Sequence, residues 1–253
     1  MSLIKSISGI RGTIGGRPGE NLTPVDIVKF TSAYGTWLGR RHTGRKLMVV
    51  IGRDARRSGN MVSSLVSTTL RSLGIDVTDI GLASTPTVEM AVTGTGSHGG
   101  IIITASHNPA EWNALKLLNE RGEFLSGGDG TELLGIAEAE DFNYAHLDAY
   151  GSYVHDDSWG SIHIEQVLAL DLVDREAIKA ADFTVAIDCV NSVGGIIVPA
   201  LLKSLGVSRI IELNTTPDGH FAHNPEPLPA NLTEISALTA QSGADVGFVV
   251  DPD

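Results

Sequence analysis

The chain has 253 residues, of which 42% are hydrophobic and 19% are charged, and its formal net charge at pH 7 is −12. These values are typical of a soluble globular protein of one or two domains, and the acidic balance argues against nucleic acid as a partner. No apolar run approaches the roughly 18 residues of a membrane span, and the first residues show no signal-peptide pattern. The single cysteine, Cys189, excludes an internal disulfide. We therefore expect a cytoplasmic protein without membrane contact.

Buried strands and amphipathic helices alternate through the first half of the chain. Apolar residues recur at helical spacing over residues 23–40, where Thr23 is a candidate cap and Pro24 suits the first turn. The remaining elements are predicted as strand 47–51, helix from 58 or 60 to 73, strand 75–80, helix 85–92 and strand 100–103. This alternation predicts a layered α/β domain.

A connection then interrupts the pattern. Residues 141–158 lack helical periodicity and are predicted to form an extended connection or a hairpin. Residues 159–180 look helical, and residues 183–187 begin the strand pattern again. We place the domain boundary here, with one domain over 1–155 and a second over 156–253.

The second half repeats the first. Leu70-Arg-Ser-Leu-Gly-Ile75 recurs as Leu202-Lys-Ser-Leu-Gly-Val207, and Ser84-Thr-Pro86 recurs at nearly the same offset as Thr215-Thr-Pro217. Their shared order favours duplication of one module over chance similarity. The predicted fold class is therefore α/β, with two tandem, duplicated three-layer α/β/α modules that contain mixed sheets.

The loop after strand 100–103 is the first candidate site. It reads Thr104-Ala-Ser-His-Asn-Pro109, so Ser106 is expected beyond the C-terminal end of a core strand, the edge where α/β sheets bind ligands. In the second module, the matching strand 246–250 leads into Asp251-Pro-Asp253. Two carboxylates suit Mg²⁺, although a simple Asp-Pro turn would also explain them.

Basic residues are concentrated in two glycine-rich segments, which are predicted to be loops. Arg53, Arg56 and Arg57 lie within Gly52–Gly59, and Arg11 lies within 8–16. Glycine lets backbone amides approach an anion, although each arginine would also be accounted for as a solvated surface charge. Lys116 could return a further positive charge to the Ser106 loop.

Ser106 has two possible covalent roles. A serine hydrolase is disfavoured because Gly-x-Ser-x-Gly is absent and His107, as the next residue, is poorly placed to act as its base. A phosphoserine beside two aspartates would be repelled unless a divalent cation lay between them. A phosphoserine, a loop with two aspartates and a metal ion are therefore consistent with one another. Arg11 and Lys116 would then offset the charge of the phosphoryl group that is transferred.

Three other patterns are weaker. Gly94-Thr-Gly-Ser-His-Gly99 matches the dinucleotide fingerprint by letters, but it precedes a strand where the fingerprint must follow one, which argues against NAD. His220 and His223 have a metal-like spacing but lack further ligands nearby. Asp188 and Asn191 suit capping and turn positions.

Taken together, these motifs resemble those of a known family. Thr104–Pro109 with Asn113-Ala-Leu-Lys116 resembles the phosphoserine loop of the α-D-phosphohexomutases, the phosphoglucomutase/phosphomannomutase family. Ser8-Gly-Ile-Arg-Gly12, Gly52-Arg-Asp-Ala-Arg56, residues 217–227 and Asp251-Pro-Asp253 resemble further family motifs in family order. The resemblance implies an isomerase that interconverts hexose 1-phosphate and hexose 6-phosphate through phosphoserine and a bisphosphate. Mg²⁺ would lie between the phosphoserine and the aspartates.

The resemblance also implies roles for individual residues. It implies Ser106, Lys116, Arg11 and His107 in catalysis, Arg53, Arg56 and Asn108 in phosphate binding, and Ser106, Asp251 and Asp253 as metal ligands. The family's metal loop reads Asp-x-Asp-x-Asp, whereas this chain ends at the second aspartate. Ala114 stands where many relatives carry glycine, on a segment expected to be helix-like.

We therefore expect the first two of four family domains, cut within the metal loop and inactive alone. The sugar remains open among glucose, mannose and glucosamine phosphates, as does the oligomeric state. The alternative is a non-catalytic phosphosugar-binding or interaction protein.

Overall fold

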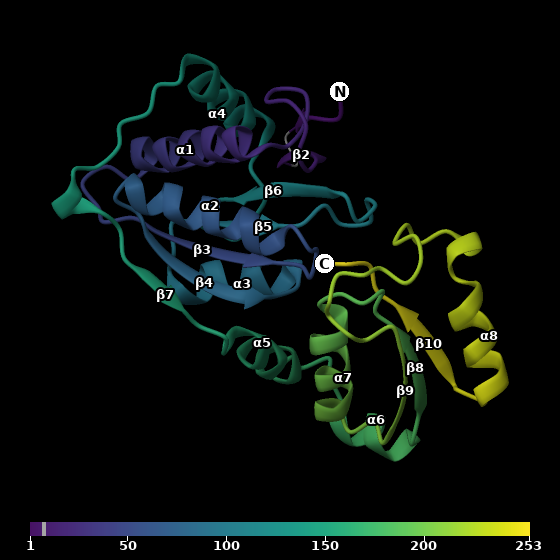
Figure 1. The fold of residues 1–253 in the computed structure, drawn as a ribbon. Helices are drawn as coiled ribbons and strands as arrows, with labels where there is room; N and C mark the ends of the chain where they lie inside the picture. Colours follow the sequence, from purple (N-terminus) through teal and green to yellow (C-terminus); the bar gives the residue numbers. More distant parts are fainter. Residues whose placement is uncertain (7–8) are drawn as a thin grey trace.

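The computed structural model describes residues 1–6 and 9–253, so Ser8 of the first glycine-rich motif lies outside the described residues. Two α/β units lie side by side, and helix α5 (Trp159–Leu168) runs between them (Figure 1). We call β1–β7 with α1–α4 the first unit and β8–β10 with α6–α8 the second unit. Within the described residues, no helix combines the length and the apolar character needed to cross a membrane.

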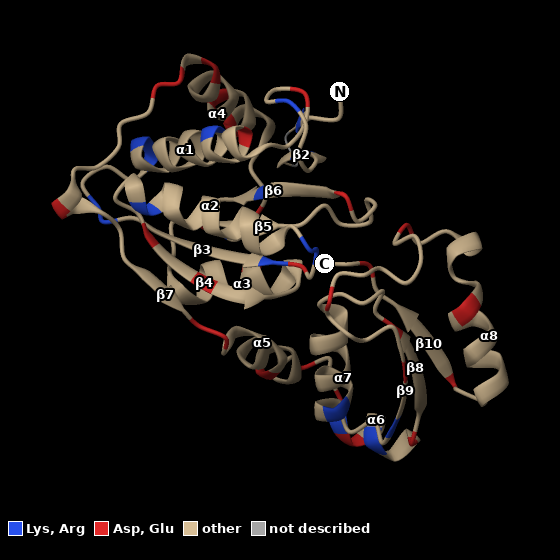
Figure 2. Ribbon diagram, in the orientation of Figure 1, with Lys and Arg blue, Asp and Glu red and all other residues tan. Residues whose placement is uncertain are grey.

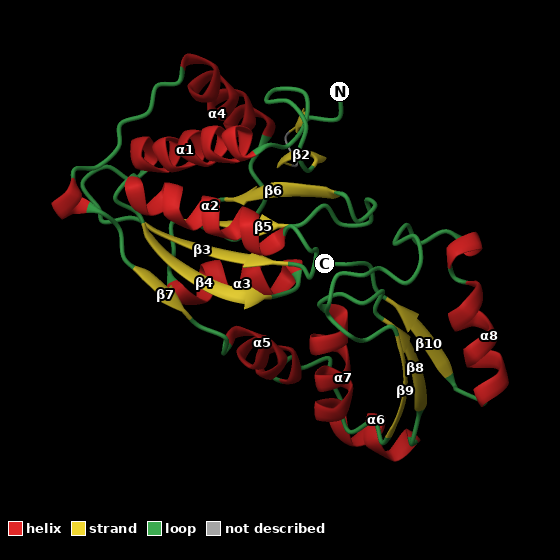
Figure 3. Ribbon diagram, in the orientation of Figure 1, coloured by secondary structure: helices red, strands yellow, loops and turns green. Residues whose placement is uncertain are grey.

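The first unit is built on a seven-stranded sheet in the order β1-β2-β6-β5-β3-β4-β7 (Figure 3). Strands β5, β3, β4 and β7 are parallel, whereas β6 is antiparallel to both β5 and β2, and β2 is antiparallel to β1. The sheet is therefore mixed, as predicted. Its strands are β1 (Ile4–Ser6), β2 (Gly9–Thr13), β3 (Met48–Arg53), β4 (Asp76–Leu82), β5 (Gly99–Ile103), β6 (Trp112–Leu118) and β7 (Tyr153–His155).

Helices cover both faces of this sheet. Helices α1 (Pro24–Arg41), α2 (Gly59–Ser72) and α4 (Gly127–Ala139) form one hydrophobic core with the strands, and α3 (Thr85–Thr95) packs on the other face. Ile101 and Ile103 join the first core, whereas Ile102 joins the second, because successive side chains of a strand point to opposite faces. All three isoleucines are fully buried, so the predicted strand buried on both faces is confirmed.

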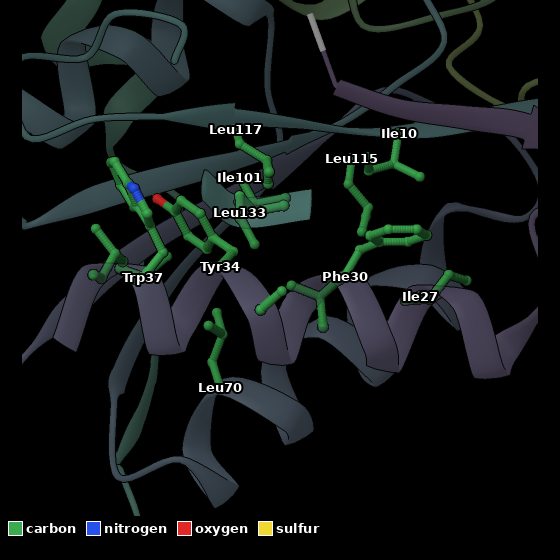
Figure 4. Close-up of a cluster of buried hydrophobic side chains, with 14 of the residues drawn as sticks. Ile10, Ile27, Phe30, Tyr34, Trp37, Leu70, Ile101, Leu115, Leu117 and Leu133 are labelled. Carbon is green, nitrogen blue, oxygen red and sulfur yellow. The ribbon is translucent and has the colours of Figure 1, made fainter. Parts of the chain in front are cut away.

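Local sequence explains the start and the packing of α1. Thr23 caps the helix and Pro24 occupies the first turn, as predicted, and Asp26 completes a capping box with Thr23. Figure 4 shows Phe30, Tyr34 and Trp37 pointing from this helix toward the strands. The buried Tyr34 hydroxyl donates to the carbonyl of Leu118 at 2.7 Å, which ties the helix to strand β6.

The second unit has a smaller sheet in the order β10-β8-β9, and these three strands are parallel. Among the described residues, the mixed sheet is thus found in the first unit, whereas the sequence predicts one in both. Its core contains Val185, Ile187, Cys189, Leu202 and Val207, all buried. The strands are β8 (Thr184–Asp188), β9 (Arg209–Leu213) and β10 (Val246–Val249), and the helices are α6 (Arg175–Ala181), α7 (Gly194–Leu205) and α8 (Thr233–Ser242).

Several predicted elements differ from the structure. The segment 113–116, expected to be helix-like, lies in strand β6, and part of the first glycine-rich segment forms strand β2. The helical stretch expected over 159–180 is divided into α5 and α6. Strand β7 pairs in parallel with β4, so residues 141–158 form an extended connection and not a hairpin.

Candidate active site

Two loops, one from each unit, meet at the C-terminal ends of their strands. Ser106 follows β5 and Asp251 follows β10, and the Ser106 Oγ donates a hydrogen bond to Asp251 Oδ2 at 2.7 Å. Figure 2 shows basic and acidic residues side by side at this junction, where the end labelled C approaches the first unit. The structure therefore brings together the serine and the aspartate that sequence separates by more than half the chain.

The backbone of Ser106 is held in an unusual conformation. Its φ of +51° is left-handed, which costs a residue with a side chain about 1–2 kcal/mol. The Ser106 amide donates to Thr104 Oγ1 at 3.0 Å, and the Ser106 carbonyl accepts from Arg56 Nη2 at 2.5 Å. Because both peptide groups of this residue are engaged, the loop fixes the backbone of Ser106, and the hydrogen bond to Asp251 directs its hydroxyl.

A small cavity of about 70 Å³ lies beside this serine. Arg11 from β2, Lys116 from β6 and Asn108 from the serine loop contribute to its wall. Within the described part of the chain, the buried Arg11 Nε and Asn108 Oδ1 have no hydrogen-bond partner. Buried polar atoms normally have partners, so these two are consistent with binding a small polar group. A sugar ring would have to lie outside this cavity.

The two aspartates of the second unit differ in their surroundings. Lys116 Nζ lies 2.6 Å from Asp253 Oδ2, and Thr85 Oγ1 donates to the same oxygen at 2.8 Å. Burial would raise the pKa of Asp253, but the charge and hydrogen bond of Lys116, together with hydrogen bonds of Thr85 and Ser106, hold this pKa below its usual value. Burial, followed by the charge of Asp253, raises the pKa of Asp251. The negative charge of Asp253 is thus paired with Lys116, whereas the negative charge of Asp251 is poorly compensated.

Arg56 does not lie where a phosphate-binding residue would. Its side chain is completely buried, and each of its five N–H groups donates to an acceptor of the protein. None is left for a substrate phosphate, so the geometry contradicts the role that the resemblance implied. Arg53 is not among the residues that line the cavity; its Nη1 donates to the carbonyl of Asp54 at 3.2 Å.

Other candidate residues have structural partners. His107 Nε2 lies 3.2 Å from Glu226 Oε2, an exposed contact between the units that contributes little to stability. His223 Nε2 lies 3.0 Å from Oδ2 of the buried Asp188. In the part of the chain that the structure describes, no three or more His, Cys, Asp or Glu side chains are grouped to hold a metal ion.

Two further hydroxyls position the aspartate loop, and sequence reasoning missed both. Ser192 is fully buried; its Oγ donates to the carbonyl of Pro252 at 2.6 Å and accepts from the amide of Ala55 at 3.3 Å. The Thr85 amide, at the start of α3, donates to the carbonyl of Asp253 at 2.9 Å. The only sequence signal at Thr85 is the repeated motif Ser84-Thr-Pro86, and this motif indicates duplication and not a role in the site.

The geometry agrees with comparisons to known proteins. Residues 3–144 match the family model "Phosphoglucomutase/phosphomannomutase, alpha/beta/alpha domain I", and residues 161–253 match the corresponding domain II. The chain belongs to the phosphoglucomutase/phosphomannomutase family. The predicted duplicated α/β fold and the resemblance stated above are thereby confirmed.

Individual relatives carry several names. The chain is 38% identical over 245 residues to a phosphoglucomutase/phosphomannomutase of Thermococcus kodakarensis, covering 96% of this chain and 53% of the relative. It is 34% identical over 247 residues to a probable phosphoglucosamine mutase of Methanopyrus kandleri, covering 97% and 51%. A family protein from Burkholderia thailandensis of known structure matches with a TM-score of 0.78 and 28% identity, over 99% of this chain and 53% of that one. This chain spans about half the length of the curated relatives it matches.

Proposed function

We propose that this chain is part of a phosphosugar mutase, an isomerase that interconverts hexose 1-phosphate and hexose 6-phosphate. The observation that carries the proposal is the Ser106 Oγ, directed at Asp251 Oδ2 at 2.7 Å beside a cavity that Arg11 and Lys116 line. A hydroxyl, a poorly compensated carboxylate and two cationic side chains suit a phosphoryl group. The names of the relatives support the same class of reaction.

In the proposed reaction, Ser106 carries the phosphoryl group. A sugar hydroxyl attacks phosphorus, the bond from phosphorus to the Ser106 Oγ breaks, and the hydroxyl proton passes to that oxygen. The resulting bisphosphate reorients in the site and transfers its other phosphoryl group back to the Ser106 Oγ. Arg11 and Lys116 stabilise the charge on the transferring oxygens, because catalysis of phosphoryl transfer consists largely of positioning and electrostatic stabilisation.

A magnesium ion fits the donor set at this junction. The Ser106 oxygen and the carboxylates of Asp251 and Asp253 are hard oxygen ligands, and Mg²⁺ is typically bound by one or two carboxylates plus phosphate and water. When bound, Mg²⁺ would neutralise charge on the phosphoryl group.

The remaining aspects of function are proposals of the same kind. We propose a hexose phosphate as the substrate, with glucose, mannose and glucosamine all allowed, and a cytoplasmic location. The acidic chain offers no argument for nucleic acid or membrane partners. We further propose that residues 1–253 alone do not turn over substrate, because the chain spans about half of its relatives and closure around the sugar is needed for positioning.

The test is phosphorylation of Ser106. The longest native protein that contains these residues is incubated with glucose 1,6-bisphosphate and Mg²⁺, and intact mass with phosphopeptide mapping is measured. We expect one phosphate on Ser106, none in Ser106→Ala, and loss of Mg²⁺ binding by calorimetry in Asp251→Asn. Absence of phosphate together with normal hexose-phosphate binding would favour the non-catalytic alternative.

A further inference from the structure

We propose that Arg56 is a positioning residue that holds Ser106 in its left-handed conformation by clamping the carbonyl groups of the serine loop. The contacts stand on their own geometry, whereas their importance for phosphoryl transfer rests on the proposed function.

The guanidinium group of Arg56 is shared between two tasks. Nε donates to Asp54 Oδ2 at 2.9 Å, which fixes the group in the core. The four remaining N–H groups converge on the loop after β5. Nη2 donates to the carbonyls of Ser106 and Asn108 at 2.5 and 2.7 Å, and Nη1 donates to those of Pro109 and Trp112 at 2.6 and 3.0 Å. A single side chain thus satisfies four carbonyl groups of a seven-residue stretch.

The clamp acts on the residue that needs it. Ser106 has a φ of +51°, a value that glycine adopts readily and other residues seldom do. Its amide is held by Thr104 Oγ1, which itself donates to Asp54 Oδ2 at 2.8 Å. The carboxylate of Asp54 therefore anchors both of the groups that hold the two sides of Ser106.

The surroundings exclude a role in direct binding. Arg56 and Asp54 are both fully buried, and the ring of Phe221 from the second unit lies 5.0 Å from the guanidinium carbon. Since no N–H is free, the guanidinium group cannot donate a hydrogen bond to a ligand, and its contacts hold the loop instead. Lysine cannot replace it, because an ammonium group has three donors and lacks the planar fork.

Arg57 provides a matched control. It is the next residue, carries the same side chain and is exposed. Hydrogen exchange is measured by mass spectrometry on peptides covering 104–116 in the wild type, Arg56→Lys and Arg57→Lys. We expect exchange of these amides to rise about tenfold or more in Arg56→Lys and to stay unchanged in Arg57→Lys.

A second substitution separates positioning from general stability. Ser106→Gly removes the conformational cost that the clamp offsets, so the double variant Arg56→Lys/Ser106→Gly should recover much of the protection at 104–116. If Arg56 contributed only to general stability, Arg56→Lys would accelerate exchange throughout the first unit, and adding Ser106→Gly would not restore protection at 104–116. Either result would overturn the proposal. If Arg56→Lys does not fold, Thr104→Val is used; it removes the other support of Ser106 and should accelerate exchange in the same peptide.

Phosphorylation provides the functional readout. We expect Arg56→Lys to slow phosphorylation of Ser106 by glucose 1,6-bisphosphate on the order of 100-fold, since a misplacement of about 1 Å has that effect. Phosphorylation at the wild-type rate in the lysine variant would contradict the proposal. If even the wild type accepts no phosphate, the proposed function fails, while the exchange measurements still decide the positioning role.

Discussion

Replacement of Lys116 by methionine tests the electrostatics of the junction. Lys116 Nζ lies 2.6 Å from Asp253 Oδ2, and the two side chains are only 19% and 5% exposed. Removing one partner of a buried ion pair costs about 3–5 kcal/mol, because the other charge stays buried without compensation. Thr85 Oγ1 still donates to the same carboxylate oxygen, so we expect the lower end of that range, about 3 kcal/mol.

The loss should depend on pH. The folded-state pKa of Asp253 is depressed in the wild type, so this carboxylate stabilises the fold above its unfolded pKa of about 3.9, and that stabilisation is lost as pH falls through the folded value. Lys116→Met removes the charge and the hydrogen bond that lower this pKa most, so the pKa of Asp253 should rise. The difference in stability between the two proteins should therefore be largest near pH 7 and should be smaller at about pH 4, because the variant's carboxyl group, with its higher pKa, takes up a proton before that of the wild type.

Urea denaturation at pH 7 and pH 4 measures both effects. Lys46→Met is the control, because the Lys46 Nζ to Asp76 Oδ1 distance is 3.4 Å and Lys46 is 55% exposed. Such a surface pair contributes about 0–1 kcal/mol. Equal losses in the two variants, or a loss in Lys116→Met that is the same at both pH values, would refute the reasoning.

Two further predictions concern the contact between the units and the buried carboxylate below the serine loop. Gly219→Ala should be clearly more destabilising than Gly243→Ala in thermal melts. Both glycines have a positive φ, so the backbone strain of the two substitutions is alike. A Cβ at Gly219 would lie 2.1 Å from the carbonyl oxygen of Ala55, whereas a Cβ at Gly243 would face open space. Equal losses would show that this close approach is unimportant. Burial, opposed in part by Arg56, raises the pKa of Asp54 to about 6; a carboxyl-detected NMR titration should show that midpoint, and one near 4 would contradict it. Because this pKa is raised, Asp54 favours the folded state most at low pH, and its contribution to stability is lost as the pH rises through the folded-state value.

The parts of the fold that could be predicted are those set by local patterns. The cap at Thr23, the apolar stripe of α1 and the run of isoleucines in β5 each determine their element within a few residues. Strand β6 could not be predicted this way, because Ala114, Leu115 and Lys116 are good helix formers. Pairing with β2 on one side and β5 on the other overrides that preference.

The candidate site shows the same division. Ser106, Asp251 and Lys116 carry reactive groups at strand ends or beside them, so their approach follows from topology. The role of Arg56 does not, because its type and spacing suit an anion equally well. Only the structure shows that four carbonyl groups and the Asp54 carboxylate occupy all five N–H groups of Arg56.

Duplication of one module explains why the strands of the two units match. Their roles differ because the corresponding aspartates of the two units have different partners. In each unit a buried aspartate at the C-terminal end of a strand, after β3 or at the end of β8, accepts a hydrogen bond from the amide two residues on. The Arg56 amide donates to Asp54 Oδ1 at 2.9 Å, and the Val190 amide donates to Asp188 Oδ1 at 3.1 Å. The other carboxylate oxygens have different partners. Asp54 binds the arginine that clamps the serine loop, whereas Asp188 lies 3.0 Å from His223.

His223 belongs to the same loop as Phe221 and Gly219, and this loop rests on the first unit. Phe221 covers the guanidinium of Arg56, and Gly219 lies against Ala55. The second unit therefore supplies two things at once, the carboxylates that face Ser106 and the ring that covers its clamp. A change in how the units pack would alter the aspartates and the support of the serine together, so the alignment of the two loops is a property of the junction and not of either unit alone.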